Sequence, residues 1–208
     1  MVEQLLQPPD TAIADHVGAL LAGCDPVVVA HSERSYQFAA AFALADRADV
    51  DHEVLYLGTI LHDVGLSPAA PGAERFEVRG ANVVRELLLD NGMTHDRADN
   101  VWDVIAMHAS TPLARNKSTE TRYANRGIAL DVRASEVDVL PPKFVREVLD
   151  RWPRRGFPAA FEAVLVAEVR AHPDSTRMSW LESIAAAHVP GFRPTDFLAV
   201  LHSSEGFA

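Results

Sequence analysis

Apolar residues recur at helical spacing along this chain, and glycine or proline residues separate one apolar run from the next. Phe157, Phe161, Val164 and Leu165, for example, follow one another at helical steps and form a single stripe. Stripes of this kind predict amphipathic helices that bury one face. The expected helices cover about residues 11–22, 26–48, 51–63, 78–91, 94–110, 123–140, 143–151, 158–171, 180–188 and 195–202.

The pattern predicts an all-α fold, a bundle of about nine or ten helices. No repeat or low-complexity segment interrupts it, and no linker is long enough to divide the chain. A length of 208 residues suits one large domain, so we expect residues 1–208 to form a single domain. Residues 143–208 are expected to close the bundle over the helices that precede them.

The balance of charges bears on the class of partner. Lys and Arg number 19 against 29 Asp and Glu, which gives a net charge of -10. This acidic excess repels phosphate backbones and anionic lipid surfaces. We therefore expect a small-molecule substrate, no nucleic acid and no membrane partner, while the sequence leaves homo-oligomer formation open.

Cysteine usage and the first residues bear on the compartment. Cys24 is the single cysteine, which excludes an intramolecular disulfide and a zinc site built from several cysteines. The N-terminal residues lack the basic start and apolar run of an export signal, and no later apolar run reaches the roughly 18 residues of a membrane span. These features predict a cytoplasmic protein.

Three of the nine histidines continue apolar stripes and are predicted to point into the bundle. They are His31, His62 and His108, and Asp63 stands beside His62 where its predicted helix ends. A single inward histidine is more often a hydrogen-bonded core residue. Several imidazoles and a carboxylate buried together need partners, and one divalent metal ion would satisfy them all.

Two aspartates extend this set. Asp131 and Asp138 are seven residues apart in the predicted helix 123–140 and would share one of its faces. Asp131 has an ordinary alternative, an ion pair with Arg126 or Arg133. The spacing alone leaves open which aspartate is functional.

The order of these residues resembles the HD superfamily of metal-dependent hydrolases. The resemblance is carried by His31, by LHDVGL at residues 61–66 and by a later helical aspartate. Further segments are similar to the cyanamide hydratase-like branch: HSERSY at 31–36, RFEVRGA at 75–81, VWDVIAMH at 101–108 and DVL at 138–140. The resemblance covers about residues 26–142 and implies an all-helical HD-type domain.

The resemblance also implies a ligand set. It makes His31, His62, Asp63 and Asp138 the metal ligands, with Asp138 preferred over Asp131 because it precedes Val139-Leu140. Members of the family with two metals usually have another histidine shortly before a Gly-Ala pair, and residues 64–94 contain none. We therefore expect one metal ion, with zinc as the first choice and iron, manganese or nickel as alternatives, while a second ion bridged by Glu77 stays an open alternative.

These residues predict a hydrolytic or hydrating mechanism. A metal ion lowers the pKa of its bound water toward about 7, so that hydroxide is available at neutral pH. Asp63 is expected to accept a proton from the water and His108 to donate one to the leaving or developing anionic atom. Glu77 is expected to orient the substrate.

Two classes of substrate compete. The branch resemblance implies a small nitrile-, cyanamide- or amide-like molecule, while the wider superfamily implies a nucleotide or another phosphomonoester. The second class needs a cationic clamp. Arg34 and Arg79 are the first candidates for substrate binding, and Arg75, Arg115 and Lys117 could contribute.

Two further interpretations rank lower. A di-iron oxygenase would need histidines that the chain lacks. A non-enzymatic binding module would be favoured by a closed metal site without room for water.

Overall fold

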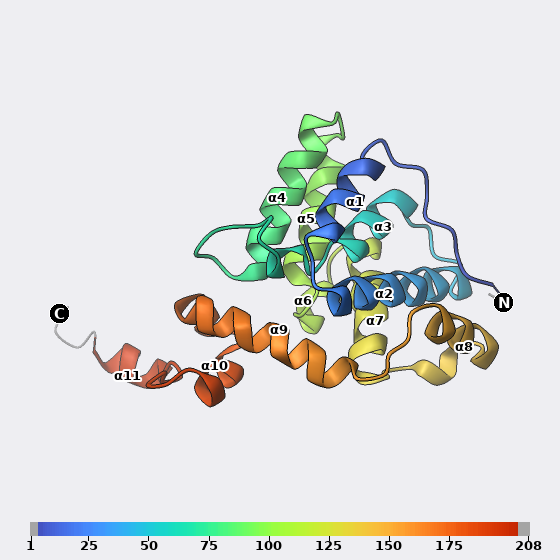
Figure 1. Ribbon diagram of the computed structural model, residues 1–208. Helices are drawn as coiled ribbons and strands as arrows, with labels where there is room; N and C mark the ends of the chain where they lie inside the picture. The colour runs from blue at the N-terminus through green and yellow to red at the C-terminus, as the bar shows by residue number, and fades with distance from the viewer. Residues whose placement is uncertain (1–3, 204–208) are drawn as a thin grey trace.

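The computed structural model describes residues 4–203, and within that range every regular element is a helix (Figure 1). The all-α prediction is confirmed. Eleven α-helices are present in the described residues, and nine of them have seven residues or more. They are α1 (Ala14–Ala22), α2 (Pro26–Ala45), α3 (His52–Ile60), α4 (Phe76–Asp90), α5 (His95–Met107), α6 (Thr111–Ala114), α7 (Thr119–Arg133), α8 (Pro142–Arg151), α9 (Phe157–Ala171), α10 (Glu182–His188) and α11 (Phe197–His202), with short 3-10 turns η1 (Val64–Leu66), η2 (Val137–Val139) and η3 (Pro173–Thr176).

Helices α2 and α7 pack closely against each other at the centre of the fold. Their backbones approach because residue 127 in α7 is glycine: a Cβ there would lie 2.4 Å from the Ser35 carbonyl oxygen and 2.5 Å from the Ala39 nitrogen. A core of aromatic and aliphatic side chains surrounds this contact and includes Phe38, Phe42, Leu55, Tyr123, Leu130 and Phe144.

A second core joins α1, α3, α4 and α5. Helices α4 and α5 lie side by side in the upper part of Figure 1, and α3 packs between α5 and α2. Its buried members include Val17, Val54, Leu57, Ile60, Val84, Leu88, Val101 and Ile105. This layer fixes the end of α3, from which the adjacent His62 and Asp63 leave the helix.

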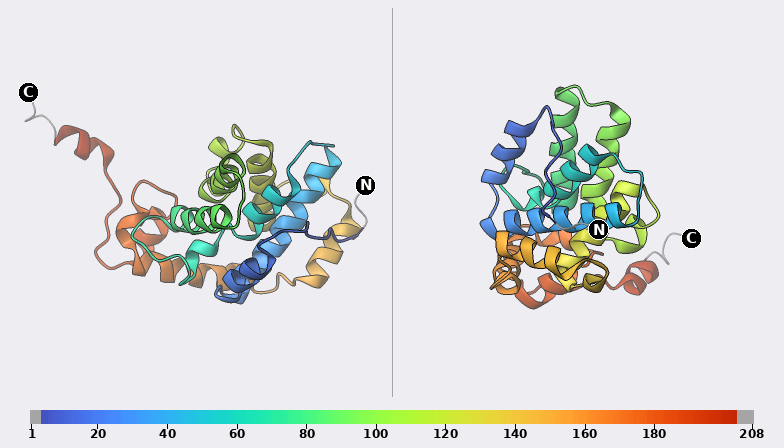
Figure 2. Two further views of the ribbon diagram at one scale, coloured as in Figure 1. Left: turned by 90° about the horizontal axis from the view of Figure 1, so that it is seen from above. Right: turned by 90° about the vertical axis from the view of Figure 1, so that its right-hand side faces the viewer.

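The C-terminal elements cover the lower side of α2. Phe144 of α8 joins the central core, and α9 contacts both α2 and η1. Leu165 and Val169 of α9 pack with Phe76, Leu181 and Ala185 in a third core. Helix α11 projects away from the other helices (Figure 2), and its Phe197 and Leu198 are exposed.

Two predicted boundaries are wrong in ways that matter. The helix expected over 123–140 begins earlier, at Thr119, and ends at Arg133, because Ala134 and Glu136 adopt left-handed backbone conformations with φ of 55° and 60°. Asp138 therefore lies in η2 and no longer shares a helix with Asp131. At the N-terminal side, the helix expected from residue 11 begins at Ala14.

None of the helices in residues 4–203 combines the length and the apolar character needed to cross a membrane.

Replacing Gly127 with alanine should destabilise the protein. The added methyl group meets backbone atoms of α2 that cannot move independently, so we expect the free energy of unfolding to fall by about 1–3 kcal/mol. Chemical denaturation monitored by circular dichroism measures this change.

Gly18 in α1 is the matched control, because nothing lies within 4 Å of a Cβ built there. Gly18→Ala should leave stability unchanged or raise it by about 0.5–1 kcal/mol through helix propensity. A Gly127→Ala protein as stable as Gly18→Ala would contradict close α2–α7 packing.

Candidate metal centre

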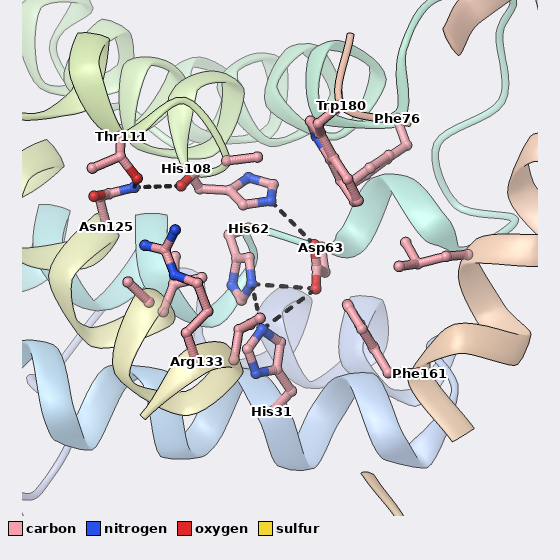
Figure 3. A pocket seen from close by; sticks show the side chains of 15 residues that line it. His31, His62, Asp63, Phe76, His108, Thr111, Asn125, Arg133, Phe161 and Trp180 are labelled. Carbon is pink, nitrogen blue, oxygen red and sulfur yellow. Dashed lines mark hydrogen bonds and ion pairs between the residues drawn. The ribbon is translucent and has the colours of Figure 1, made fainter. Parts of the chain in front are cut away.

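Helix α2 and the turn after α3 bring two histidines and an aspartate together (Figure 3). His31 comes from the second turn of α2, and His62 and Asp63 come from the turn after α3. The Nε2 atoms of His31 and His62 are 3.2 Å apart. Asp63 Oδ2 lies 3.2 Å from His62 Nε2 and 3.8 Å from His31 Nε2. All three side chains are buried, so their mutual contacts replace contacts with bulk water.

His108, the residue that follows α5, completes the cluster. Its Nε2 atom lies 3.5 Å from Asp63 Oδ1, on the other oxygen of the same carboxylate. The His62 and His108 rings meet edge to face with centroids 4.8 Å apart. The three predicted inward histidines and Asp63 therefore occupy one site.

Hydrogen bonds on the far side of each ring fix the atom that faces the centre. His62 Nδ1 donates to the Thr59 carbonyl and His108 Nδ1 donates to the Ile105 carbonyl, both at 2.7 Å. His31 Nδ1 donates to the Asp131 carboxylate at 2.7 Å. Because each Nδ1 carries the proton, each neutral ring turns an Nε2 lone pair toward Asp63.

The centre of the cluster contains acceptors without a donor. Asp63 Oδ2 is buried and has no hydrogen-bond partner among the described residues. One ligand atom each from His31, His62 and Asp63 lies within 4.8 Å of the others. Imidazole nitrogen and carboxylate oxygen are the donor types that bind zinc and other first-row divalent metals, so the residues fit a metal ion.

Comparisons with known proteins agree with this geometry. A family model for the HD domain matches residues 28–139, more than half of the chain and all of the cluster. The chain belongs to the HD domain family. It is also 28% identical over 152 residues to the cyanamide hydratases DDI2 and DDI3 of Saccharomyces cerevisiae (strain ATCC 204508 / S288c), which covers 70% of this chain and 67% of each relative. These matches identify a metal-dependent hydrolase or hydro-lyase.

Electrostatics in the HD site favour a positive charge at its centre. Burial raises the pKa of the Asp63 carboxyl, but the facing imidazoles, led by His62, outweigh burial and hold this pKa below its usual range. Burial lowers the pKa of His62, yet the Asp63 carboxylate more than offsets that effect and the pKa is raised. For His31 and His108 burial is the larger influence, and their pKa values are lowered.

The helical carboxylate beside the HD cluster is Asp131. Its two oxygens accept hydrogen bonds from Arg34 Nε and Nη2 at 2.7 and 2.8 Å, and one of them also holds His31 Nδ1. Asp138 is exposed in η2, and the structure does not bring it to the cluster. The choice of Asp138 over Asp131 is thus corrected, because the helix that would have aligned them ends at Arg133.

Arg34 is placed differently from its prediction as a substrate-binding residue. Its side chain is 1% exposed, forms the paired contact with Asp131, and lies 5.1 Å from the Phe157 ring centroid. Arg34 therefore positions Asp131, which in turn orients His31.

Glu77 and Arg79 are also buried in contacts within the protein. Glu77 forms an ion pair with Arg75 and accepts a hydrogen bond from Trp180 Nε1 at 3.1 Å. Arg79 donates to the carbonyls of Ala70, Glu74 and Gly65 and to the Glu168 carboxylate of α9. Neither side chain lines the cavity described next, so the structure does not bring them to the wall that a substrate there would contact.

A cavity of about 320 Å³ opens beside the cluster of His31, His62, Asp63 and His108, called the His–Asp cluster below. Most of its wall is apolar, and it reaches the surface near the exposed Val132 and Arg133. The room for water beside the metal ligands argues against a closed structural site. The lining residues are His31, His62, Asp63, Phe76, His108, Ala109, Thr111, Asn125, Ile128, Ala129, Val132, Arg133, Phe161, Leu165 and Trp180.

Sequence reasoning missed several of these lining residues. Asn125, Ile128, Ala129, Val132 and Arg133 recur at helical spacing on one face of α7. The sequence does contain a pattern that could have indicated them, because an asparagine and an arginine lie at the two ends of this mostly apolar stripe. Phe161 and Trp180 come from the C-terminal elements, which the resemblance did not cover.

Asp131→Asn and Asp138→Asn form a matched pair of variants. Loss of the Asp131 charge leaves the buried Arg34 uncompensated and weakens the hold on His31. We expect the free energy of unfolding to fall by about 3–5 kcal/mol and metal affinity to fall by about 10- to 100-fold.

Chelator competition and thermal unfolding measure the two effects. Asp138→Asn should match the wild-type protein in both measurements because Asp138 is exposed. Loss of metal affinity in Asp138→Asn alone would restore the original assignment.

Proposed function

We propose that this protein hydrates or hydrolyses a small nitrile-, cyanamide- or amide-like molecule with water activated by one divalent metal ion. The main support is the position of the His–Asp cluster on the wall of a largely apolar cavity. The similarity to yeast proteins named cyanamide hydratases supports the same class of substrate.

His31, His62 and Asp63 would hold the metal ion, with Asp131 orienting His31 from behind. Zinc suits this mixed set, and iron, manganese or nickel bind the same donor types. When bound, the ion supplies water of lowered pKa. The single cluster found in the described residues supports one ion, and Glu77 is engaged by Arg75 and Trp180.

Asp63 and His108 supply the proton transfers in this proposal. Water adds across the carbon–nitrogen triple bond: its oxygen bonds to carbon, and Asp63 accepts the proton it releases. His108 faces Asp63 through Nε2, while its Nδ1 donates to Ile105. Asp63 passes this proton to the His108 Nε2 lone pair, 3.5 Å away, and Nε2 then delivers it to the nitrile nitrogen. Tautomerisation of the adduct yields the amide product.

The apolar wall supports this reaction class. Phe76 lies 5.8 Å from His108 and 6.4 Å from Trp180 between ring centroids, and Phe161 lies 5.3 Å from His31. These rings restrict water around the reacting carbon and strengthen the electrostatic interactions there. Glu77 acts on the substrate through Trp180, whose indole it holds.

Phosphomonoester hydrolysis, the alternative, receives less support. It needs several cationic groups around the phosphate near the metal, and Arg34 and Arg79 are both committed to buried contacts, which leaves Arg133 as the one lysine or arginine among the described residues that line the cavity. Arg75, Arg115 and Lys117 pair with Glu77, Glu136 and Asp103.

Activity with cyanamide, a simple nitrile, an amide and p-nitrophenyl phosphate tests the proposal. The metal-loaded protein should form urea from cyanamide or an amide from the nitrile, and should release little phosphate. Preferred release of phosphate, or no metal-dependent turnover of any nitrogen compound, would overturn it.

Two site variants separate metal binding from proton transfer. Asp63→Asn should lose both metal and activity, because a ligand is removed. His108→Gln should keep the metal and lose about 100- to 10,000-fold in kcat.

Asp90→Asn is the control for these variants, since Asp90 is exposed at the end of α4. It should match wild type in metal content and kcat. Full activity of His108→Gln would remove His108 from the mechanism.

A further inference from the structure

The cavity has two chemically different sides. Thr111, Asn125 and Arg133 lie on one side of the His–Asp cluster, and Phe76, Phe161 and Trp180 lie on the other (Figure 3). A substrate whose reacting carbon sits at the cluster therefore meets polar groups on one flank and aromatic rings on the other.

Arg133 is the unusual member of the polar side. It is the one lysine or arginine among the residues that line the cavity. Among the described residues, its guanidinium has no hydrogen-bond or ion-pair partner. Figure 3 shows its guanidinium pointing toward the cavity between Asn125 and His62.

Three buried or half-buried arginines of the fold behave differently. Arg34, Arg79 and Arg126 each form ion pairs with carboxylates, in a chain with 29 acidic residues and a net charge of -10. Arg133 is exposed where the cavity reaches the surface, and it is set apart because it lines the cavity without a carboxylate partner among the described residues. A planar bidentate group such as a carboxylate matches its guanidinium.

Asn125 adds a second recognition element. Its Nδ2 donates to the His108 carbonyl at 2.6 Å and lies 3.4 Å from Thr111 Oγ1. Its Oδ1 accepts no hydrogen bond from the described residues. The oxygen is therefore available to accept a hydrogen bond from a substrate N–H beside the group that Arg133 binds.

We infer that the substrate is an anionic member of the proposed class: a nitrile, cyanamide or amide with a carboxylate near the reacting carbon, bound by Arg133. This inference rests on the proposed function and specifies its substrate. The cavity has room for such a molecule, because its roughly 320 Å³ is about ten times the 30 Å³ or so that one water molecule occupies in the liquid. Cyanamide alone, a carbon between two nitrogens, leaves most of it empty.

Carboxymethylcyanamide and ethylcyanamide are a matched pair of probes. They share the cyanamide group and differ in a carboxylate against a methyl group. Hydration of each adds one water across the triple bond and gives the corresponding urea. The metal-loaded wild-type protein should favour carboxymethylcyanamide by about tenfold or more in kcat/KM.

Arg133→Gln should lower kcat/KM for carboxymethylcyanamide by about 10- to 100-fold, which is the range for one charge-assisted contact. It should leave ethylcyanamide and the metal content unchanged. Arg133→Lys keeps the charge without the planar fork and should fall between wild type and Arg133→Gln.

Arg122→Gln is the control, because Arg122 is exposed on α7 and outside this cavity. It should retain the wild-type preference for the anionic probe. Equal turnover of the two probes by wild type, or an unchanged preference in Arg133→Gln, would overturn the inference while leaving the proposed function standing.

If neither probe is turned over, the assay with cyanamide, a simple nitrile and an amide decides the proposed function, and binding decides whether Arg133 recognises the carboxylate. Isothermal titration calorimetry then measures the affinity of both probes for the metal-loaded wild-type and Arg133→Gln proteins. Tighter binding of carboxymethylcyanamide that depends on Arg133 supports the site, and equal binding refutes it.

Discussion

The buried carboxylate of Asp63 imposes the constraint on which this site depends. Three imidazole rings face it, and the Nδ1–H of each ring donates a hydrogen bond to an acceptor on the side away from Asp63. What remains at the centre is a set of lone pairs that only a cation or a proton can satisfy. This need for a cation or a proton depends on Thr59, Ile105 and Asp131 as much as on the rings, because these three residues accept the Nδ1 hydrogen bonds.

A second buried charge makes that arrangement rigid. Arg34 binds both oxygens of Asp131, and Asp131 binds His31, so an ion pair between α2 and α7 sets the orientation of an imidazole. Ion pairs buried in this way contribute little net stability when complete but are costly to break. Their effect here is to leave His31 one orientation toward the cluster.

Much of the cluster could be predicted from the sequence because helical spacing determines which side chains face inward. His31, His62 and His108 continue apolar stripes, and the adjacent Asp63 follows from its neighbour. Asp138 could not be judged in the same way, since periodicity assumes a continuous helix and the left-handed turn at Ala134 interrupts it. The roles of Arg34 and Arg79 could not be predicted either, because the sequence does not tell whether an arginine on a helix contacts solvent, a substrate or a carboxylate such as Glu168. The partners that decide among these lie far away in the sequence.

Helix α7 separates two tasks on two of its faces. Gly127 and Asp131 meet α2 and keep the spacing between helices that the metal ligands require. Ile128, Ala129, Val132 and Arg133 turn toward the cavity instead. Substitutions on the cavity face can therefore change which molecules bind while the metal ligands keep their positions. A few such substitutions would be enough to change the substrate selectivity. One chemistry could be redirected to different molecules within this fold, either by natural divergence or by laboratory evolution confined to those four positions.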